Sequence, residues 1–179
     1  MVLLRTKHLT NGKIFLCGEV TDEMANDFIL QATYLAERKQ PFTVYINTPG
    51  GSVNAGLAIY DTIQICSKEV AIDLKCTGMA ASMGAVLLAG GPKGHRFILP
   101  HSKVMIHEPL ISNGVGGSAT TIKKTAETIL ETKALTNSIL AKHTGKSVEE
   151  IDRATSFDNY MNAQEAITFG ICDAVCNSI

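Results

Sequence analysis

The sequence lacks the features that define membrane proteins and nucleic-acid-binding proteins. No apolar run approaches the roughly 20 residues of a membrane-spanning helix, and the N-terminal MVLLRTKH has no long apolar segment of the kind found in a secretory signal. Charge is balanced, with 16 Lys and Arg against 17 Asp and Glu, and aromatic residues make up 6% of the chain. Without basic runs or many aromatic side chains, neither a membrane nor a nucleic acid is expected as a partner.

Cysteine occurs without a pattern that would bind a metal or form disulfides. The five cysteines are odd in number, lack C-x-x-C spacing and lie mostly among apolar residues: Cys17, Cys66, Cys76, Cys172 and Cys176. We therefore expect reduced thiols, a cytoplasmic location and no metal centre. Linkers, repeats and low-complexity tracts are also missing, so residues 1–179, 45% of them hydrophobic, are expected to form a single domain.

Apolar residues follow strand and helix periods in turn along the first two thirds of the chain. Strands are predicted over residues 13–17, 42–46, 70–77, 96–99 and 104–106, and helices from the Thr21 cap to Pro41, over 53–66, and from Ser82 to Ala89. Three strand-then-helix units predict right-handed crossovers and a largely parallel sheet, an α/β fold. Two shorter helices follow later, one after a capping box at Ser147 and one from Asn162 to Gly170.

A long helix is predicted over about residues 118–143, after a glycine-rich polar segment. A helix of about 25 residues spans roughly 38 Å, which is more than a compact domain of this size needs. Its apolar stripe is thin, so we expect it to project and pack against another subunit. A surface helix that lies across the body is the alternative.

Ser82 is the candidate nucleophile, in the stretch TGMAASMGAVLLAGG. It stands where a strand passes into a helix, among backbone N–H groups at the positive end of the helix dipole, and this environment favours a developing anion. Small residues around it leave room for another backbone, and the N–H of Met83 could face an oxyanion. The alternative is a serine that only caps the helix, and the G-x-S-x-G elbow of α/β-hydrolases is absent.

A serine nucleophile needs a base, and His107 is the strongest of the five histidines. It ends the apolar strand Val104–Ile106, at the carboxyl rim of the sheet where α/β sites form. His101 remains a second possibility in a turn. The other three lie in polar or charged stretches where an exposed position is expected: His8, His95 and His143.

The acid of a triad and the oxyanion hole are less well defined by the pattern. Asp152, Asp158 and Asp173 all lie in the C-terminal third, and their spacing does not choose between them, although Asp158 lies in an irregular stretch between two predicted helices. Gly50-Gly51 follows a strand and could expose a second oxyanion N–H, or could simply form a tight turn.

Four motifs in order resemble those of the ClpP family, the proteolytic subunits of the caseinolytic (Clp) serine proteases. They are INTPGGSVNAGLAIYDT, GMAASMGAVLLAGG, MIHEP and DNYMNAQEAITFGICD. The resemblance runs from about Gly12 to Val175. It implies Ser82 as nucleophile, His107 as general base and Asp158 as its orienting acid, with the N–H groups of Gly51 and Met83 as oxyanion hole.

The resemblance also implies an architecture and partners. The fold would be crotonase/ClpP-like, with repeated β-β-α and βα units and the helix at 118–143 as a handle between two stacked heptamers. Peptide would bind as an added strand beside Ile111, Ser112, Asn113, Gly114 and Val115. Protein and peptide substrates would be cleaved in the chamber, an AAA+ unfoldase of the Clp family would supply them, and ATP would be used by that partner, so the chain itself would need no cofactor.

Two departures from the family pattern lie beside the expected site. Ser156-Phe157 stands where many relatives carry an acidic–basic pair, and Glu108 replaces the glutamine common after the histidine, which adds a negative charge beside the expected base. Two alternatives are a weakly active subunit that scaffolds a mixed ring with a ClpP paralogue, and a crotonase-type acyl-CoA enzyme. The acyl-CoA enzyme would leave the serine–histidine pairing unexplained.

Overall fold

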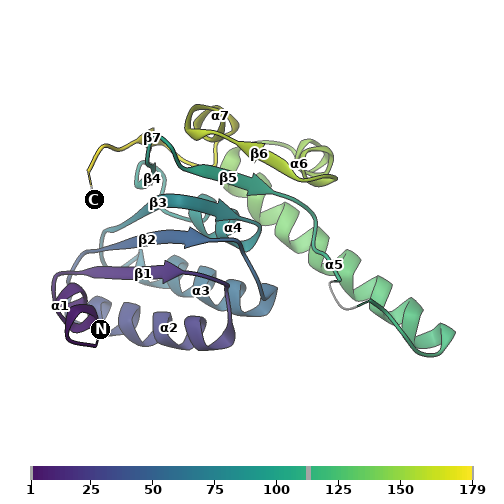
Figure 1. The fold of residues 1–179 in the computed structure, drawn as a ribbon, viewed down its shortest axis with the longest axis horizontal. Helices are drawn as coiled ribbons and strands as arrows, with labels where there is room; N and C mark the ends of the chain where they lie inside the picture. The colour runs from purple at the N-terminus through teal and green to yellow at the C-terminus, as the bar shows by residue number, and fades with distance from the viewer. Residues whose placement is uncertain (1, 112–113, 179) are drawn as a thin grey trace.

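The computed structural model describes residues 2–111 and 114–178, which form helices packed on a seven-stranded sheet (Figure 1). The elements in chain order are α1 Val2–Thr10, β1 Lys13–Cys17, α2 Asp22–Glu37, β2 Phe42–Thr48, α3 Val53–Cys66, β3 Ile72–Ala81, α4 Met83–Ala89, β4 Arg96–Ile98, β5 Lys103–Ile106, α5 Ala119–Thr144, α6 Val148–Thr155, β6 Asn159–Met161, α7 Ala163–Phe169 and β7 Ala174–Val175. The mixed α/β class expected from the sequence is confirmed.

The main sheet has the strand order β1-β2-β3-β4-β7, and each neighbouring pair is parallel. Strands alternate with the helices α2, α3 and α4, which lie together on one face of the sheet (Figure 1). Alternate residues of β1 and β2 point into the core beneath these helices, among them Ile14, Leu16, Val44 and Ile46, each at most 1% exposed. The predicted parallel sheet with crossover helices is therefore confirmed.

The edge of β3 is shared between two strands. Leu74 to Cys76 pair with β4, whereas Met79 to Ala81 pair with β5, so the sheet forks along one strand. Ser102 lies buried in the fork, where its hydroxyl accepts the Gly78 N–H at 2.7 Å and donates to the Cys76 carbonyl at 3.2 Å. β5 continues into an antiparallel pair with β6, which the sequence did not predict.

Arg96 is a charged residue at the centre of the packing. Its side chain is 2% exposed, and its guanidinium makes hydrogen bonds with both carboxylate oxygens of Asp173. It also donates to three carbonyls that lie at the C-terminal ends of α4, α5 and α7, those of Ala89, His143 and Gly170. Because the carboxyl end of a helix is negatively polarised, one cation stabilises three helix ends at once.

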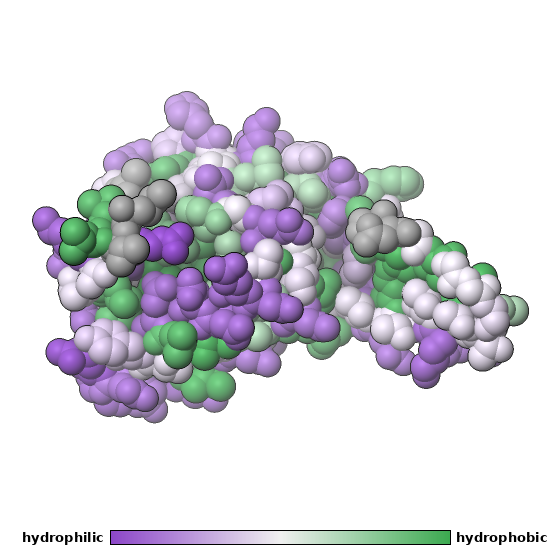
Figure 2. Space-filling view, turned by 60° about the horizontal axis from the view of Figure 1, so that its bottom comes forward, coloured by the Kyte–Doolittle hydropathy of each residue, from purple (hydrophilic) through white to green (hydrophobic). Residues whose placement is uncertain are grey.

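The long helix α5 is buried only near its C-terminal end. Its buried residues lie between positions 136 and 141, and the N-terminal half extends away from the body (Figure 1). The exposed part carries apolar side chains beside charged and weakly polar ones, including Ile122, Leu130 and Leu135, and Figure 2 shows it as a protrusion at the right. The predicted projection is confirmed, and a helix lying across the body is wrong. In the described residues no helix is long and apolar enough to cross a membrane.

His143 differs from its sequence-based expectation. It lies at the packed end of α5, where its Nε2 is 2.8 Å from the Tyr60 hydroxyl and the two rings meet edge to face. Burial, together with the charges of Lys142 and Arg96, lowers the pKa of His143 to about 4. The expected exposed position is wrong, because the C-terminal end of α5 lies against the body of the molecule, where Tyr60 of α3 contacts the imidazole.

Candidate active site

Ser82 joins β3 to α4 in a strained backbone conformation. Its φ of 54° and ψ of −121° are unfavourable for a residue with a side chain, and such strain is found at catalytic turns. Its N–H donates to the Met105 carbonyl at 2.8 Å, which fixes the turn against β5. Within the described residues its hydroxyl makes no capping hydrogen bond to α4. The structure thus disfavours the capping interpretation of this serine.

Strand register brings a histidine and an aspartate to this serine. Ala81 of β3 pairs with Met105 of β5, and Ile106 of β5 pairs with Asn159 of β6. Ser82 directly follows the last residue of β3, and His107 directly follows the last residue of β5. Because β6 runs antiparallel to β5, Asp158, which precedes β6, comes to the same end of the pair as His107. Three positions far apart in sequence therefore meet at one corner of the sheet.

The three side chains are joined by two hydrogen bonds through one imidazole. The distance from His107 Nε2 to Ser82 Oγ is 3.0 Å, and the distance from His107 Nδ1 to Asp158 Oδ1 is also 3.0 Å. The His107 side chain is 15% exposed, whereas the carboxylate of Asp158 is largely open to solvent. If Nδ1 carries the proton toward the carboxylate, Nε2 is left as an acceptor for the serine hydroxyl.

Of the alternatives that the sequence left open, the histidine is exposed and the two aspartates pair with cations. His101 lies exposed in the turn between β4 and β5. Asp152 pairs with Lys133 at 2.9 Å, and Asp173 pairs with Arg96. Asp158 is thus the carboxylate that the fold brings to His107. The sequence could not select it, because the signal is the pairing of the three-residue strand β6 with β5.

The glycine turn after β2 lies directly against the serine. A side chain at Gly50 would place its Cβ 2.6 Å from Ser82 Cβ, and Gly50 also has a φ of 98°. The Gly50 N–H donates to Thr48 Oγ1 at 3.1 Å. Gly51, with a φ of 147°, forms a parallel bridge with Val20, and its Cβ would lie 2.4 Å from the Val20 carbonyl oxygen. Both positions therefore require glycine.

A small apolar pocket of about 20 Å³ opens beside the hydroxyl. Besides Ser82 and His107, it is lined by residues of α3, α4, β5, α5 and the segment after β5, almost all of them apolar: Val53, Met83, Val86, Ile106, Pro109, Thr136 and Leu140. Such a lining fits an apolar side chain. Of the segment expected to bind peptide, Ile111, Gly114 and Val115 are exposed, whereas Ser112 and Asn113 lie outside the described residues.

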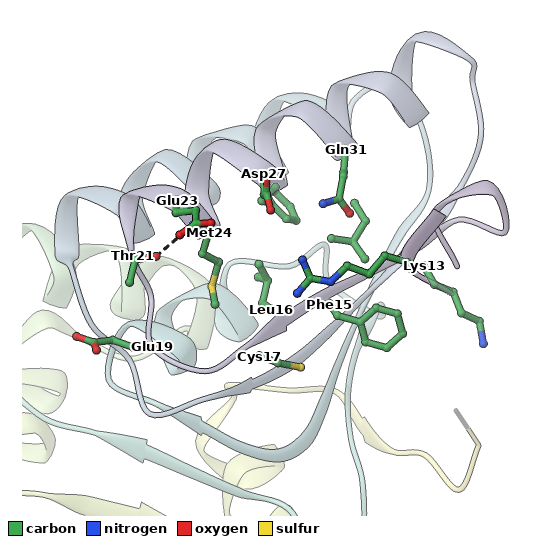
Figure 3. A pocket seen from close by; sticks show the side chains of 13 residues that line it. Lys13, Phe15, Leu16, Cys17, Glu19, Thr21, Glu23, Met24, Asp27 and Gln31 are labelled. Atoms are coloured by element: carbon green, nitrogen blue, oxygen red, sulfur yellow. Dashed lines mark hydrogen bonds between the residues drawn. The ribbon is translucent and has the colours of Figure 1, made fainter. Parts of the chain in front are cut away.

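A larger pocket of about 310 Å³ lies between the edge strand β1 and α2 and shares no lining residue with the pocket beside Ser82 (Figure 3). Its lining includes the basic residues Arg5 and Lys13 and the acidic residues Glu19, Glu23 and Asp27. Across the part of the chain that the structure describes, no group of three His, Cys, Asp or Glu side chains could hold a metal ion.

Comparison with known families gives a match over nearly the whole chain. The family model described as Clp protease matches residues 2–178, nearly the whole chain. The match extends from α1 to the residues after β7, so it includes the serine, the histidine, the aspartate and the long helix α5. On this evidence the chain belongs to the Clp protease family.

Proposed function

We propose that the chain is the serine endopeptidase core of an ATP-dependent protease, with Ser82 as nucleophile, His107 as general base and Asp158 as the acid that orients the imidazole. The observation that carries this proposal is the pair of 3.0 Å hydrogen bonds through the two nitrogens of His107. A base held between a hydroxyl and a carboxylate in this order is the arrangement that nucleophilic acyl transfer needs.

The reaction begins when Ser82 Oγ bonds to the carbonyl carbon of a peptide and its proton passes to His107 Nε2. The N–H groups of Met83 and Gly51 stabilise the resulting oxyanion. Use of the Gly50 N–H by Thr48 supports Gly51 as the donor from this turn. The imidazolium then protonates the departing amine as the C–N bond breaks, which leaves an ester on Ser82. Water, deprotonated by His107, releases the acid and restores the hydroxyl.

The apolar pocket beside Ser82 supports a preference for an apolar side chain next to the bond that is cleaved. The peptide backbone would lie extended beside Ile111 to Val115, as an added strand.

The exposed half of α5, with Ile122, Leu130 and Leu135, supports an interface with other copies of the chain. Two stacked heptamers would enclose the sites in a cytoplasmic chamber. A Clp-family AAA+ unfoldase would use ATP to deliver unfolded chains, while peptides would be cleaved without it.

Labelling with a fluorophosphonate tests the chemistry directly. We expect the assembled protein to be labelled and Ser82→Ala not to be, and we expect His107→Ala to be labelled at least ~100-fold more slowly because it lacks the general base. Labelling of Ser82→Ala at the normal rate would remove Ser82 from the mechanism. An assembled particle that is not labelled would instead favour a scaffolding subunit of a mixed ring, and turnover of an acyl-CoA would favour a crotonase-type enzyme.

A further inference from the structure

The segments that carry His107 and Asp158 are both tied to the last turn of α6. Glu108 follows the histidine directly, and its N–H donates to the carbonyl of Thr155 at 2.8 Å. Thr155 is the last residue of α6, three positions before the aspartate, and it is fully buried. The position of Thr155 therefore affects both the histidine and the aspartate.

Side chains of α5 hold this turn in place. The Thr155 hydroxyl donates to Asn137 Oδ1 at 3.3 Å, and Asn137 Nδ2 donates to Asp152 Oδ1 at 3.2 Å. One turn earlier on α5, Lys133 Nζ lies 2.9 Å from Asp152 Oδ1 and 2.9 Å from Glu108 Oε2. The ammonium thus joins α6 to the residue that follows His107.

Lys133 lies where α5 meets the body of the molecule. Residues 119–131 of α5 are exposed or half-buried, and the buried part begins at Thr136. The Lys133 side chain itself is 23% exposed. Lys133 is thus near the first contact that the projecting half of the helix makes with the rest of the fold. A displacement of this half of α5 would change the contacts of Lys133 before those of the buried part.

The Lys133 ammonium lies between two carboxylates that would otherwise repel each other, and it holds them together by attracting both. Its hydrogen bonds to Asp152 and Glu108, together with their charges, raise the pKa of Lys133 above the ordinary lysine value, at which the ammonium is already protonated at neutral pH. Ser156 and Phe157, which lead into Asp158, carry no charge, and Phe157 is 85% exposed. The charged link from α5 to this region runs through Lys133.

We propose that Lys133 is a positioning residue, whose ammonium holds Glu108 and Asp152 together and thereby keeps His107 aligned between Ser82 and Asp158. The proposal rests on the peptidase function proposed above. Lys133 does not line the pocket beside Ser82, and it is not a partner in the two hydrogen bonds of the imidazole. It therefore acts through Glu108 and α6. Through this link the packing of α5 controls how well the imidazole is placed for proton transfer.

The test compares full-length variants by fluorophosphonate labelling and by kcat and KM on a fluorogenic peptide with an apolar residue before the cleaved bond. Because small misplacements of a catalytic group are costly, Lys133→Met is expected to lower kcat and the labelling rate about tenfold or more, with a smaller change in KM. Lys133→Arg keeps the charge and is expected to keep most of the rate. Lys39→Met, which removes an exposed ion pair with Glu69 outside α5, is the matched control and should match the unmodified chain.

Glu108→Gln gives a second test, because it removes the charge of a partly exposed side chain and leaves Lys133 in place. If Lys133 acts through Glu108, the loss caused by Lys133→Met will be smaller in the Glu108→Gln background than in the unmodified chain. Independent effects in the double variant, or unchanged labelling of Lys133→Met, would overturn the inference. Failure of the unmodified chain to be labelled would instead count against the proposed peptidase function.

Discussion

Replacement of Arg96 by methionine is expected to destabilise the fold strongly while leaving a side chain of similar length. The change leaves the Asp173 carboxylate, 17% exposed, without its cation, and removes a donor from the carbonyls of Ala89, His143 and Gly170. Removing one partner of a buried ion pair costs about 3–5 kcal/mol. For a chain of this size, that loss lowers the melting temperature by about 6–20 °C.

The pH dependence separates the loss of the ion pair from a simple packing defect. Burial opposes ionisation of Asp173, but the hydrogen bonds and charge of Arg96, with the N–H groups of Arg96 and Gly94, outweigh it and lower the pKa of Asp173. A lowered pKa stabilises the folded state above the ordinary carboxyl value of about 4, and this contribution is lost as the pH falls through the folded pKa. The difference in melting temperature between the unmodified chain and Arg96→Met should therefore become smaller at acidic pH.

Thermal unfolding followed by circular dichroism at pH 7 and near pH 3.5 measures both effects. Arg153→Met, an exposed arginine of α6, is the control and should change stability by less than about 0.5 kcal/mol. A fall of less than about 2 °C for Arg96→Met at pH 7 would refute the reasoning, because it would correspond to about 1 kcal/mol or less. A difference in melting temperature that stays constant with pH would show that the Arg96–Asp173 ion pair is not the source of the lost stability.

Three further predictions concern the candidate active site and are measured by peptide hydrolysis. Asp158→Asn should lower kcat by about 10³–10⁴-fold with little change in KM, because the imidazole is held in the wrong tautomer; Asp152→Asn, on a neighbouring carboxylate, should cost far less. Gly50→Ala should abolish labelling of Ser82 while the chain still assembles, because its Cβ would meet Ser82 Cβ at 2.6 Å; normal labelling would contradict the close approach. Leu140→Ala should widen the apolar pocket and shift cleavage toward bulkier apolar residues, and an unchanged cleavage pattern in a peptide library would show that Leu140 does not limit the pocket.

Local chemistry in the sequence predicted much of the fold. Thr21, Ser147 and Asn162 cap the helices they were expected to begin, with side chains that accept hydrogen bonds from the first turn, and α7 ends at Gly170 as expected. α1 was not predicted, because its consecutive apolar residues have no helical period and two of them, Leu3 and Leu4, are exposed. β6 and β7 were not predicted either, because strands of three and two residues leave too little pattern.

The candidate site was predicted through its residue types, whereas its geometry depends on contacts between distant segments. A cap and a nucleophile look alike in sequence, and the strained backbone of Ser82 distinguishes them only in three dimensions. The choice among Asp152, Asp158 and Asp173 likewise depends on which cation or imidazole each one meets. Spacing along the chain does not contain that information, because strand pairing decides it.

Because β4 and β5 share one edge of β3, the residues that stabilise the fold and the residues of the candidate active site lie on different branches of the sheet. Arg96, on the β4 branch, anchors the helix ends, whereas His107 and Asp158 belong to the β5 branch with β6. Ser102 lies where the branches diverge: its hydroxyl bonds to Gly78 and Cys76 of β3, and its N–H donates to the carbonyl of Leu99, just after β4, at 3.0 Å. Substitutions on the β4 branch are therefore expected to change mainly the stability of the fold, and substitutions on the β5 branch mainly the rate of catalysis.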